Sequence, residues 1–343
     1  MRRLSVFAAA ITMAAFTFAQ DAGPYKVLKT AKVGGAGGFD YVNADAGGRK
    51  LYIARSGEAP RISVFDLDTL APVGEIRNTN AHGAVVSQKS NHGFASSKPL
   101  TMFDAKTLAT IKTIDVDGRP DGLMYDAFND RVYVLSHSTP NATVINAADG
   151  SIAGTIDLGG APEQAATDGK GRVYVAIEDK DNIAVIDAKT MKVTAHYDIA
   201  GKGGTCAGLA LDAKNQILFA ACRAPQKMVI LSAKDGKVIT TLPIGRGTDG
   251  AGFNPGTMEA FSSQGDGTLT IIKENGPARF SVEQTVPTMA GAKSMTLDAG
   301  TNRVMLITAE YGPAPVPKTA PENGRIARGP MVPDSFSIIV VGK

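Results

Sequence analysis

The sequence has no tryptophan, two cysteines and four histidines among its 343 residues. Without tryptophan, the Trp-Asp signature of WD-type repeats cannot occur. The cysteines allow one disulfide bond, and they do not form the Cys-x-x-Cys-His sequence that attaches haem. A phosphate-binding glycine loop, His-Glu-x-x-His and Gly-x-Ser-x-Gly are also missing. These absences argue against the nucleotide-binding, zinc-protease and esterase classes that carry such motifs.

Strong charge and long apolar runs are also scarce. The formal net charge of +3 argues against a strongly electrostatic nucleic-acid surface. One apolar run, Leu4 to about Phe16, follows Arg2 and Arg3 and precedes the small residues around Ala19. This order is typical of a cleaved secretory signal peptide, with a retained anchor as the alternative. We therefore expect residues 1–19 to be removed, no membrane span afterwards, and a periplasmic or secreted protein.

One short segment recurs along the chain at intervals of about 40 residues, a period typical of propeller blades. Ser63-Val-Phe-Asp-Leu-Asp-Thr-Leu returns as Thr101-Met-Phe-Asp-Ala-Lys-Thr-Leu. The seven copies begin at Ser63, Thr101, Thr143, Ala184, Val229, Thr270 and Ser337. The final interval is longer and contains a Pro-rich insert at about 312–334.

Each period divides into four short β-branched or aromatic strands separated by turn residues. We therefore predict an all-β fold: a single seven-bladed β-propeller over residues 20–343, with four antiparallel strands in each blade. The chain ends on a third strand, Ser335–Val341, and residues 25–35 match a fourth. The N-terminal strand should close the last blade and remove an exposed sheet edge.

The repeats resemble the YVTN-type β-propeller family of YncE-like periplasmic proteins. The matching segments are Lys50-Leu-Tyr-Ile-Ala, Arg131-Val-Tyr-Val and Arg172-Val-Tyr-Val-Ala, each followed by a strand of Val-Ile-Asp type. No copy keeps the full Tyr-Val-Thr-Asn string. The resemblance covers about residues 25–343 and implies the fold, whereas such propellers serve varied functions.

Strand order places the loops that enter each first strand and those that leave each second strand on one face, where binding residues usually lie. Alignment of the blades predicts a ring around the mouth of the central channel. Its ionisable members are Asp40, His82, Asp121, Glu163, Asp249 and Lys293. A second tier, from the ends of the second strands, contains Arg55, His137, Glu178, Arg223, Gln264, Glu310 and Tyr311.

Carboxylates that face one another repel, so such a ring needs water, a proton, Lys293, His82 or a bound cation. Asp40, Asp121, Glu163 and Asp249 are the candidate metal ligands. Oxygen ligands favour calcium or magnesium, and His82 would admit a transition metal. A hydrated polar funnel without any ligand is the alternative. The Pro-rich insert should emerge on the same face, as a flap over the channel or as an irregular surface loop.

Cys206 and Cys222 flank a turn at equal distances, so an antiparallel hairpin would set them opposite each other. In an exported chain this predicts a disulfide bond, with a free nucleophilic thiol as the alternative. The predicted function is an exported, monomeric binding scaffold for a small ligand, an ion or a periplasmic protein. A metal-assisted hydrolase of the lactonase type and an accessory to a periplasmic redox system stay open. No residue is assigned a catalytic role.

Overall fold

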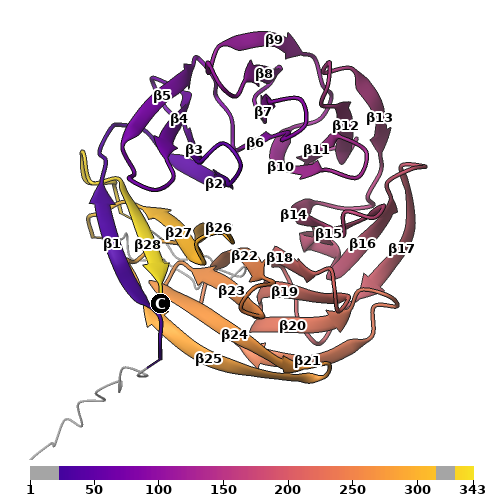
Figure 1. The fold of residues 1–343 in the computed structure, drawn as a ribbon. Coiled ribbons are helices and arrows are strands. Elements are labelled where there is room, and N and C mark those ends of the chain that lie inside the picture. Colours follow the sequence, from indigo (N-terminus) through magenta and orange to yellow (C-terminus); the bar gives the residue numbers. More distant parts are fainter. Residues whose placement is uncertain (1–22, 314–328) are drawn as a thin grey trace, which may run out of the picture.

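The computed structural model describes residues 23–313 and 329–343. Its strands form seven four-stranded antiparallel sheets. The sheets are arranged as blades around a central axis, with each first strand innermost (Figure 1). The predicted seven-bladed β-propeller is confirmed. Among the described residues, the only helix is a single 3-10 turn, η1 (Glu178–Lys180).

The first four blades follow one another along the chain. Blade one contains β2 (Phe39–Asp45), β3 (Lys50–Arg55), β4 (Arg61–Asp66) and β5 (Pro72–Arg77). Blade two contains β6 (Ala84–Val86), β7 (His92–Ala95), β8 (Leu100–Asp104) and β9 (Thr110–Ile114). Blade three contains β10 (Pro120–Asp126), β11 (Arg131–Ser136), β12 (Ala142–Asn146) and β13 (Ile152–Ile156). Blade four contains β14 (Pro162–Thr167), β15 (Arg172–Ile177), β16 (Asn182–Asp187) and β17 (Lys192–Asp198).

The last three blades complete the ring. Blade five contains β18 (Cys206–Asp212), β19 (Ile217–Arg223), β20 (Gln226–Ser232) and β21 (Val238–Pro243). Blade six contains β22 (Thr248–Asn254), β23 (Glu259–Gln264), β24 (Thr268–Gly276) and β25 (Arg279–Pro287). Blade seven contains β26 (Ser294–Asp298), β27 (Arg303–Thr308), β28 (Ser337–Gly342) and β1 (Lys26–Lys32).

The Asp-x-x-Thr part of the repeat forms the turn between the third and fourth strands of a blade. Asp187 Oδ1 accepts hydrogen bonds from the Thr190 amide at 2.8 Å and from its hydroxyl at 3.0 Å. Met191 follows with a φ of 55°, which brings the chain into the fourth strand. Asp66 and Asp104 make the same two bonds in blades one and two. The repeated letters therefore encode a turn that is stabilised by side chains.

The hydrophobic core lies between the blades. Each cluster of buried side chains joins one blade to the next: Val185 of blade four, for example, belongs to the same cluster as Leu218 and Val229 of blade five. Seven such clusters match the seven junctions between blades. Stability therefore depends on an unbroken ring, because a missing blade would expose two apolar faces.

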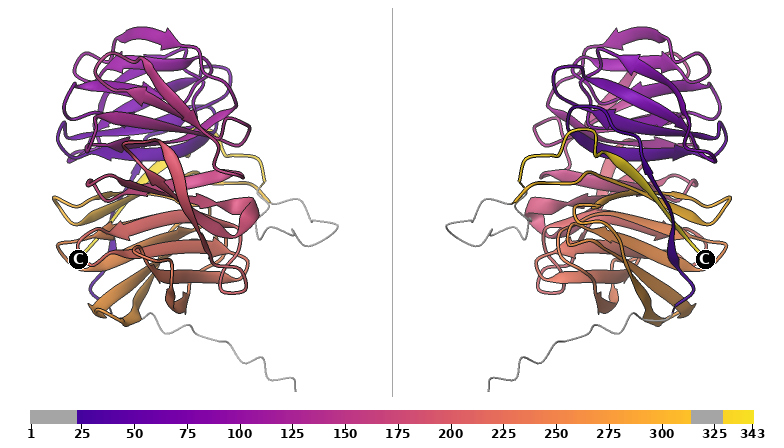
Figure 2. Two further views of the ribbon diagram at one scale, coloured as in Figure 1. Left: turned by 90° about the vertical axis from the view of Figure 1, so that its right-hand side faces the viewer. Right: turned by 90° about the vertical axis from the view of Figure 1, so that its left-hand side faces the viewer.

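The two ends of the described chain close the ring together. β1 pairs antiparallel with β28, from Lys26 opposite Gly342 to Lys32 opposite Ser337. The right-hand view of Figure 2 shows the indigo N-terminal strand beside the yellow C-terminal strand. The predicted closure by the N-terminal strand is thus present, and β28 has a partner on each side.

Some predicted features lie partly or wholly outside the described residues. The signal peptide at residues 1–19 is one of them, and so is most of the Pro-rich insert. Where the insert leaves the propeller, Gly312 N donates to Pro330 O at 2.8 Å and Val332 N donates to Glu310 O at 2.8 Å. In the described part of the chain, no helix has the length and apolarity that a membrane crossing requires.

Candidate functional site

The first strands of the blades bring the predicted ring residues to one mouth of the channel. Asp40, Asp121, Glu163 and Asp249 each stand second in the innermost strand of their blade. His82 and Lys293 lie just before β6 and β26. The position in blade five is Ala207, which has no charge. Three second-tier residues, His137, Glu178 and Arg223, also lie in the ring, at or directly after the ends of β11, β15 and β19.

One half of the ring, which we call the histidine arc, consists of Asp40, His82, Asp121, His137 and Glu163. Nδ1 of His82 lies 2.8 Å from Asp40 and 3.3 Å from Oδ1 of Asp121. Oδ2 of Asp121 lies 3.3 Å from Nε2 of His137, and that nitrogen lies 4.0 Å from Glu163. Each carboxyl oxygen of Asp121 therefore faces a different histidine.

Burial and charge move the pKa values of the histidine arc. Burial raises the pKa of the Glu163 carboxyl to about 10, together with a hydrogen bond to Glu178 and the charge of Asp249. Burial, followed by the charge of Asp40, raises the pKa of Asp121 above its ordinary value. The hydrogen bond with Asp40 raises the pKa of His82. The arc therefore holds protons more tightly than isolated groups of these types would.

The other half, the arginine arc, consists of Glu178, Arg223, Asp249 and Lys293. Arg223 Nη1 lies 2.7 Å from Glu178, and Arg223 Nη2 and Lys293 Nζ each pair with one oxygen of Asp249. Burial alone would raise the pKa of Asp249, but the charges of Lys293 and Arg223 hold it below the ordinary value. Arg223 and Lys293 therefore supply the positive charges that balance the carboxylates of this arc.

Arg223 links the two arcs and takes the place that Ala207 leaves in blade five. Its Nη1 lies 3.8 Å from Glu163, and its side chain is only 3% exposed. Nε of Arg223 donates to the Thr248 carbonyl at 3.0 Å, which fixes the guanidinium group against blade six. A continuous series of charged contacts therefore runs from Asp40 in blade one to Lys293 before blade seven.

Beneath the ring, a cavity of about 630 Å³ is lined by the innermost strands and includes Tyr41, Glu163 and Gln164. Oε1 of Gln164 accepts hydrogen bonds from the amides of Leu209 and Ala251, both at 3.0 Å. Its Nε2 donates to the Ala251 carbonyl at 3.0 Å. One side chain thus connects the innermost strands of blades four, five and six directly below Glu163.

Tyr41 and Gln164 are the site residues that the sequence analysis missed. Burial, followed by the charges of Asp121, Glu163, Asp40 and Asp249, raises the pKa of Tyr41, so its hydroxyl stays neutral below the ring. Each of the two residues directly follows a ring carboxylate in the sequence. The signal available in the sequence was the polar residue that directly follows each of these two ring carboxylates.

The remaining second-tier residues lie outside the ring. Arg55 is buried, its guanidinium stacks 3.8 Å from the centre of the Phe336 ring, and its Nη2 donates to the Gly35 carbonyl at 2.9 Å. It orders the Gly34–Gly38 loop between β1 and β2. Gln264 is buried and accepts a hydrogen bond from the Thr268 hydroxyl at 3.0 Å.

Glu310 and Tyr311 occupy the start of the insert. Glu310 makes an exposed ion pair with Lys32 at 3.4 Å. Tyr311 forms an isolated antiparallel bridge with Met331, on the returning side of the insert. Both residues therefore belong to the base of the insert, beside the closing strand, and whether they bind a ligand stays a prediction.

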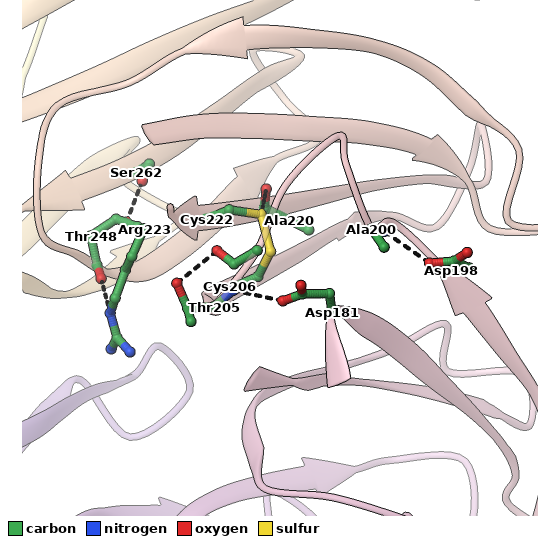
Figure 3. Close-up of a disulfide and its surroundings, with 11 residues drawn as sticks. Asp181, Asp198, Ala200, Thr205, Cys206, Ala220, Cys222, Arg223, Thr248 and Ser262 are labelled. Carbon is green, nitrogen blue, oxygen red and sulfur yellow. Dashed lines mark hydrogen bonds between the residues drawn. A yellow bond between two sulfur atoms is a disulfide. The ribbon is translucent and has the colours of Figure 1, made fainter. Parts of the chain in front are cut away.

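The predicted disulfide bond is present between Cys206 and Cys222, which lie opposite each other in β18 and β19. Figure 3 shows it beside Arg223 and Thr248. Because Cys222 directly precedes Arg223, the bond constrains the strand end that supplies the bridging guanidinium group.

Comparisons with known proteins identify the fold and no closer kinship. No family model matches the chain, and no curated protein matches it. A solved structure described as the mitotic checkpoint complex contains a chain with a TM-score of 0.71 and 10% identity, covering 89% of this chain and 95% of that one. The structure of U3-55K matches with a TM-score of 0.68 and 11% identity, covering 93% and 99%. At such identities the likeness shows a β-propeller fold alone.

Proposed function

We propose that this protein is an exported binding scaffold of the YVTN-repeat type, and that its ring face binds a cationic ligand. The observation that carries the proposal is the unequal charge of the two arcs. The arginine arc pairs Asp249 with two cations. Among the described residues, no lysine or arginine lies within ion-pair distance of Asp40 or Asp121. The histidine arc therefore has carboxyl groups without a permanent counter-charge.

Physical chemistry supports a cation in this position. Largely buried carboxyl groups without a close counter-ion take up protons, which is the direction of the pKa changes at Glu163 and Asp121. A bound cation would replace those protons and make the ionised carboxylates favourable. Hydrogen bonds of Gln164 already hold the innermost strands below the ring in place, so cation binding would cost little conformational entropy.

The ligand could be a metal ion, a small organic cation or a basic group of a periplasmic protein. Export through a signal peptide at residues 1–19 is part of the proposal and fits a chain with a disulfide bond. The YVTN assignment rests on the Arg131-Val-Tyr-Val and Arg172-Val-Tyr-Val-Ala repeats. Hydrolysis and a redox role stay predictions from the sequence, because the described geometry favours neither over binding.

Thermal melts test the proposal. Spermidine and divalent cations should each be added to metal-free protein, and at least one should raise the melting temperature by about 3 °C or more at a saturating concentration. Asp121→Asn should abolish the shift because Asp121 faces both histidines. Asp117→Asn is the matched control, since Asp117 is an exposed carboxylate in the loop before the same strand. No shift with any cation, or an equal shift in Asp121→Asn, would refute the proposal.

A further inference from the structure

Two groups of side chains in the histidine arc have the composition of metal sites. Asp40, His82 and Asp121 form the outer group, and Asp121, His137 and Glu163 form the inner group. Within each group the candidate ligand atoms all lie within 4.8 Å of one another. Asp121 belongs to both groups and offers a different oxygen to each histidine.

The inner group has spacings close to those of a tetrahedral site. Two donor atoms bound about 2.1 Å from the same ion at tetrahedral angles are about 3.4 Å apart. Oδ2 of Asp121 and Nε2 of His137 are 3.3 Å apart. Glu163 Oε1 lies 4.0 Å from the same nitrogen and within 4.8 Å of the other candidate ligand atoms.

A separate observation points to a ligand at this place. Nε2 of His137 is buried and makes no hydrogen bond, although it is directed at two carboxyl groups. Burying a polar atom without a hydrogen bond costs free energy. The Glu163 side chain is 7% exposed and has no cation nearer than the 3.8 Å contact with Arg223 among the described residues. A metal ion would satisfy both groups at once.

We infer that Asp121, His137 and Glu163 bind a divalent first-row transition-metal ion of the zinc type. The inference rests on the proposed function and names the class of cation that the ring face takes. The exposed outer pair, Asp40 and His82, would make the first contact with the ion, because His82 is 50% exposed and His137 only 24%. The side chains of the outer pair are therefore more exposed than those of the inner group.

The donor set decides between classes of metal. Calcium and magnesium prefer sites built from oxygen alone, whereas imidazole nitrogen favours zinc and its neighbours. This changes the metal set expected from the sequence, in which Asp249 was a fourth oxygen ligand. The Asp249 carboxylate instead forms ion pairs with Arg223 and Lys293. Three protein ligands leave one tetrahedral position for water or for a donor atom of a partner molecule.

The direct test is a calorimetric titration of metal-free full-length protein with zinc chloride at pH 7. We expect one ion per chain at the inner group, and at least tenfold weaker binding in both His137→Asn and Glu163→Gln. His82→Asn should weaken binding less than His137→Asn does. His196→Asn is the matched control: this histidine lies on β17, where Nε2 lies 3.2 Å from the Leu158 carbonyl, and its loss should leave zinc binding unchanged.

The outcomes separate the inference from the proposed function. Zinc binding that His196→Asn weakens as much as His137→Asn would overturn the inference, as would equally tight calcium binding. If zinc fails to bind while spermidine stabilises the protein and Asp121→Asn removes that effect, the proposed function stands and the metal inference is wrong. If neither spermidine nor any divalent cation binds, both are wrong. Unaltered circular dichroism of each variant shows that a loss of binding is not a loss of folding.

Discussion

Glu163 and Asp249 hold equivalent places in blades four and six, yet their pKa values move in opposite directions. Burial raises the pKa of both groups. Asp249 is directly paired with Lys293 and Arg223, and these cations outweigh the burial. Glu163 has Arg223 only at 3.8 Å and Glu178 as a neighbour of like charge. The nearest partner, not the position in the repeat, decides the protonation state.

The raised pKa of Glu163 predicts a pH-dependent stability in metal-free protein. Above the ordinary value of 4.5 the unfolded chain releases this proton, whereas the folded chain keeps it up to a pH of about 10. The group therefore lowers the free energy of unfolding as the pH rises across that window, by at most about 1.4 kcal/mol per pH unit.

Glu163→Gln should remove this decrease in the free energy of unfolding with rising pH, because the neutral glutamine side chain imitates the protonated carboxyl group. Urea denaturation from pH 5 to pH 9 in the presence of EDTA should show the variant gaining stability relative to the wild type as the pH rises. Glu58→Gln, which changes an exposed acid in the loop between β3 and β4, should show no such trend. A difference between Glu163→Gln and wild type that is independent of pH would contradict the assignment.

For single residues, the sequence repeat predicts which side chains lie together in the ring. It does not predict which of them form ion pairs or hydrogen bonds with one another. The innermost strands of the blades share one register, so equivalent positions in them carry the four ring carboxyl groups, Asp40, Asp121, Glu163 and Asp249. His137 and Arg223 reach the same ring from the second strands, and their contacts depend on how neighbouring blades pack. Ala207 leaves a vacant position, and Arg223 fills it through its contacts with Glu163 and Asp249. Such contacts between blades leave no spacing signal in the sequence.

Blade five shows how a single element supports the site. Cys206 and Cys222 join its two inner strands, and the bond ends one residue before Arg223. Equal spacing about one turn was enough to predict this pairing, since antiparallel register follows from the turn. The innermost strand of blade two, β6, has only three residues.

Replacing both cysteines with alanine should destabilise the protein by about 3 kcal/mol, the cost expected for opening a loop of this length. The sequence separation between the two cysteines is 16 residues. Urea denaturation measures the loss, and reduced wild-type protein should lose a similar amount. Alkylation of unfolded, unreduced protein should add no label. Two labels per chain without reductant would contradict the bond.

The whole molecule depends on ring closure by two segments that are far apart in the sequence. β1 covers the edge of β28, and Tyr25 is held on blade six by Gln284, which accepts from its amide at 2.9 Å and donates to its carbonyl at 2.8 Å. Lys343 Nζ reaches Glu259 at 2.8 Å, and the Tyr25 hydroxyl donates to the same carboxylate. Both ends are thus fixed at one junction. The sequence predicted the strand pairing, but not this set of polar contacts.

Deleting residues 20–35 should convert the protein to aggregates, because β28 would become an open edge and the cluster between blades seven and one would be exposed. Size-exclusion chromatography and the soluble yield measure the effect. A chain that begins at Gly23 keeps β1 and should elute as a monomer. A soluble deletion variant that unfolds cooperatively would contradict the proposed role of β1 in stability.

The account as a whole depends on a cation in the histidine arc, and anomalous diffraction at the zinc edge tests this most directly. Crystals of the wild type grown with zinc should show one strong peak between Oδ2 of Asp121, Nε2 of His137 and Glu163. Crystals of His137→Asn should show none at that place. Wild-type crystals in which the arc carries no peak, while zinc is found only at surface histidines such as His196, would contradict the account.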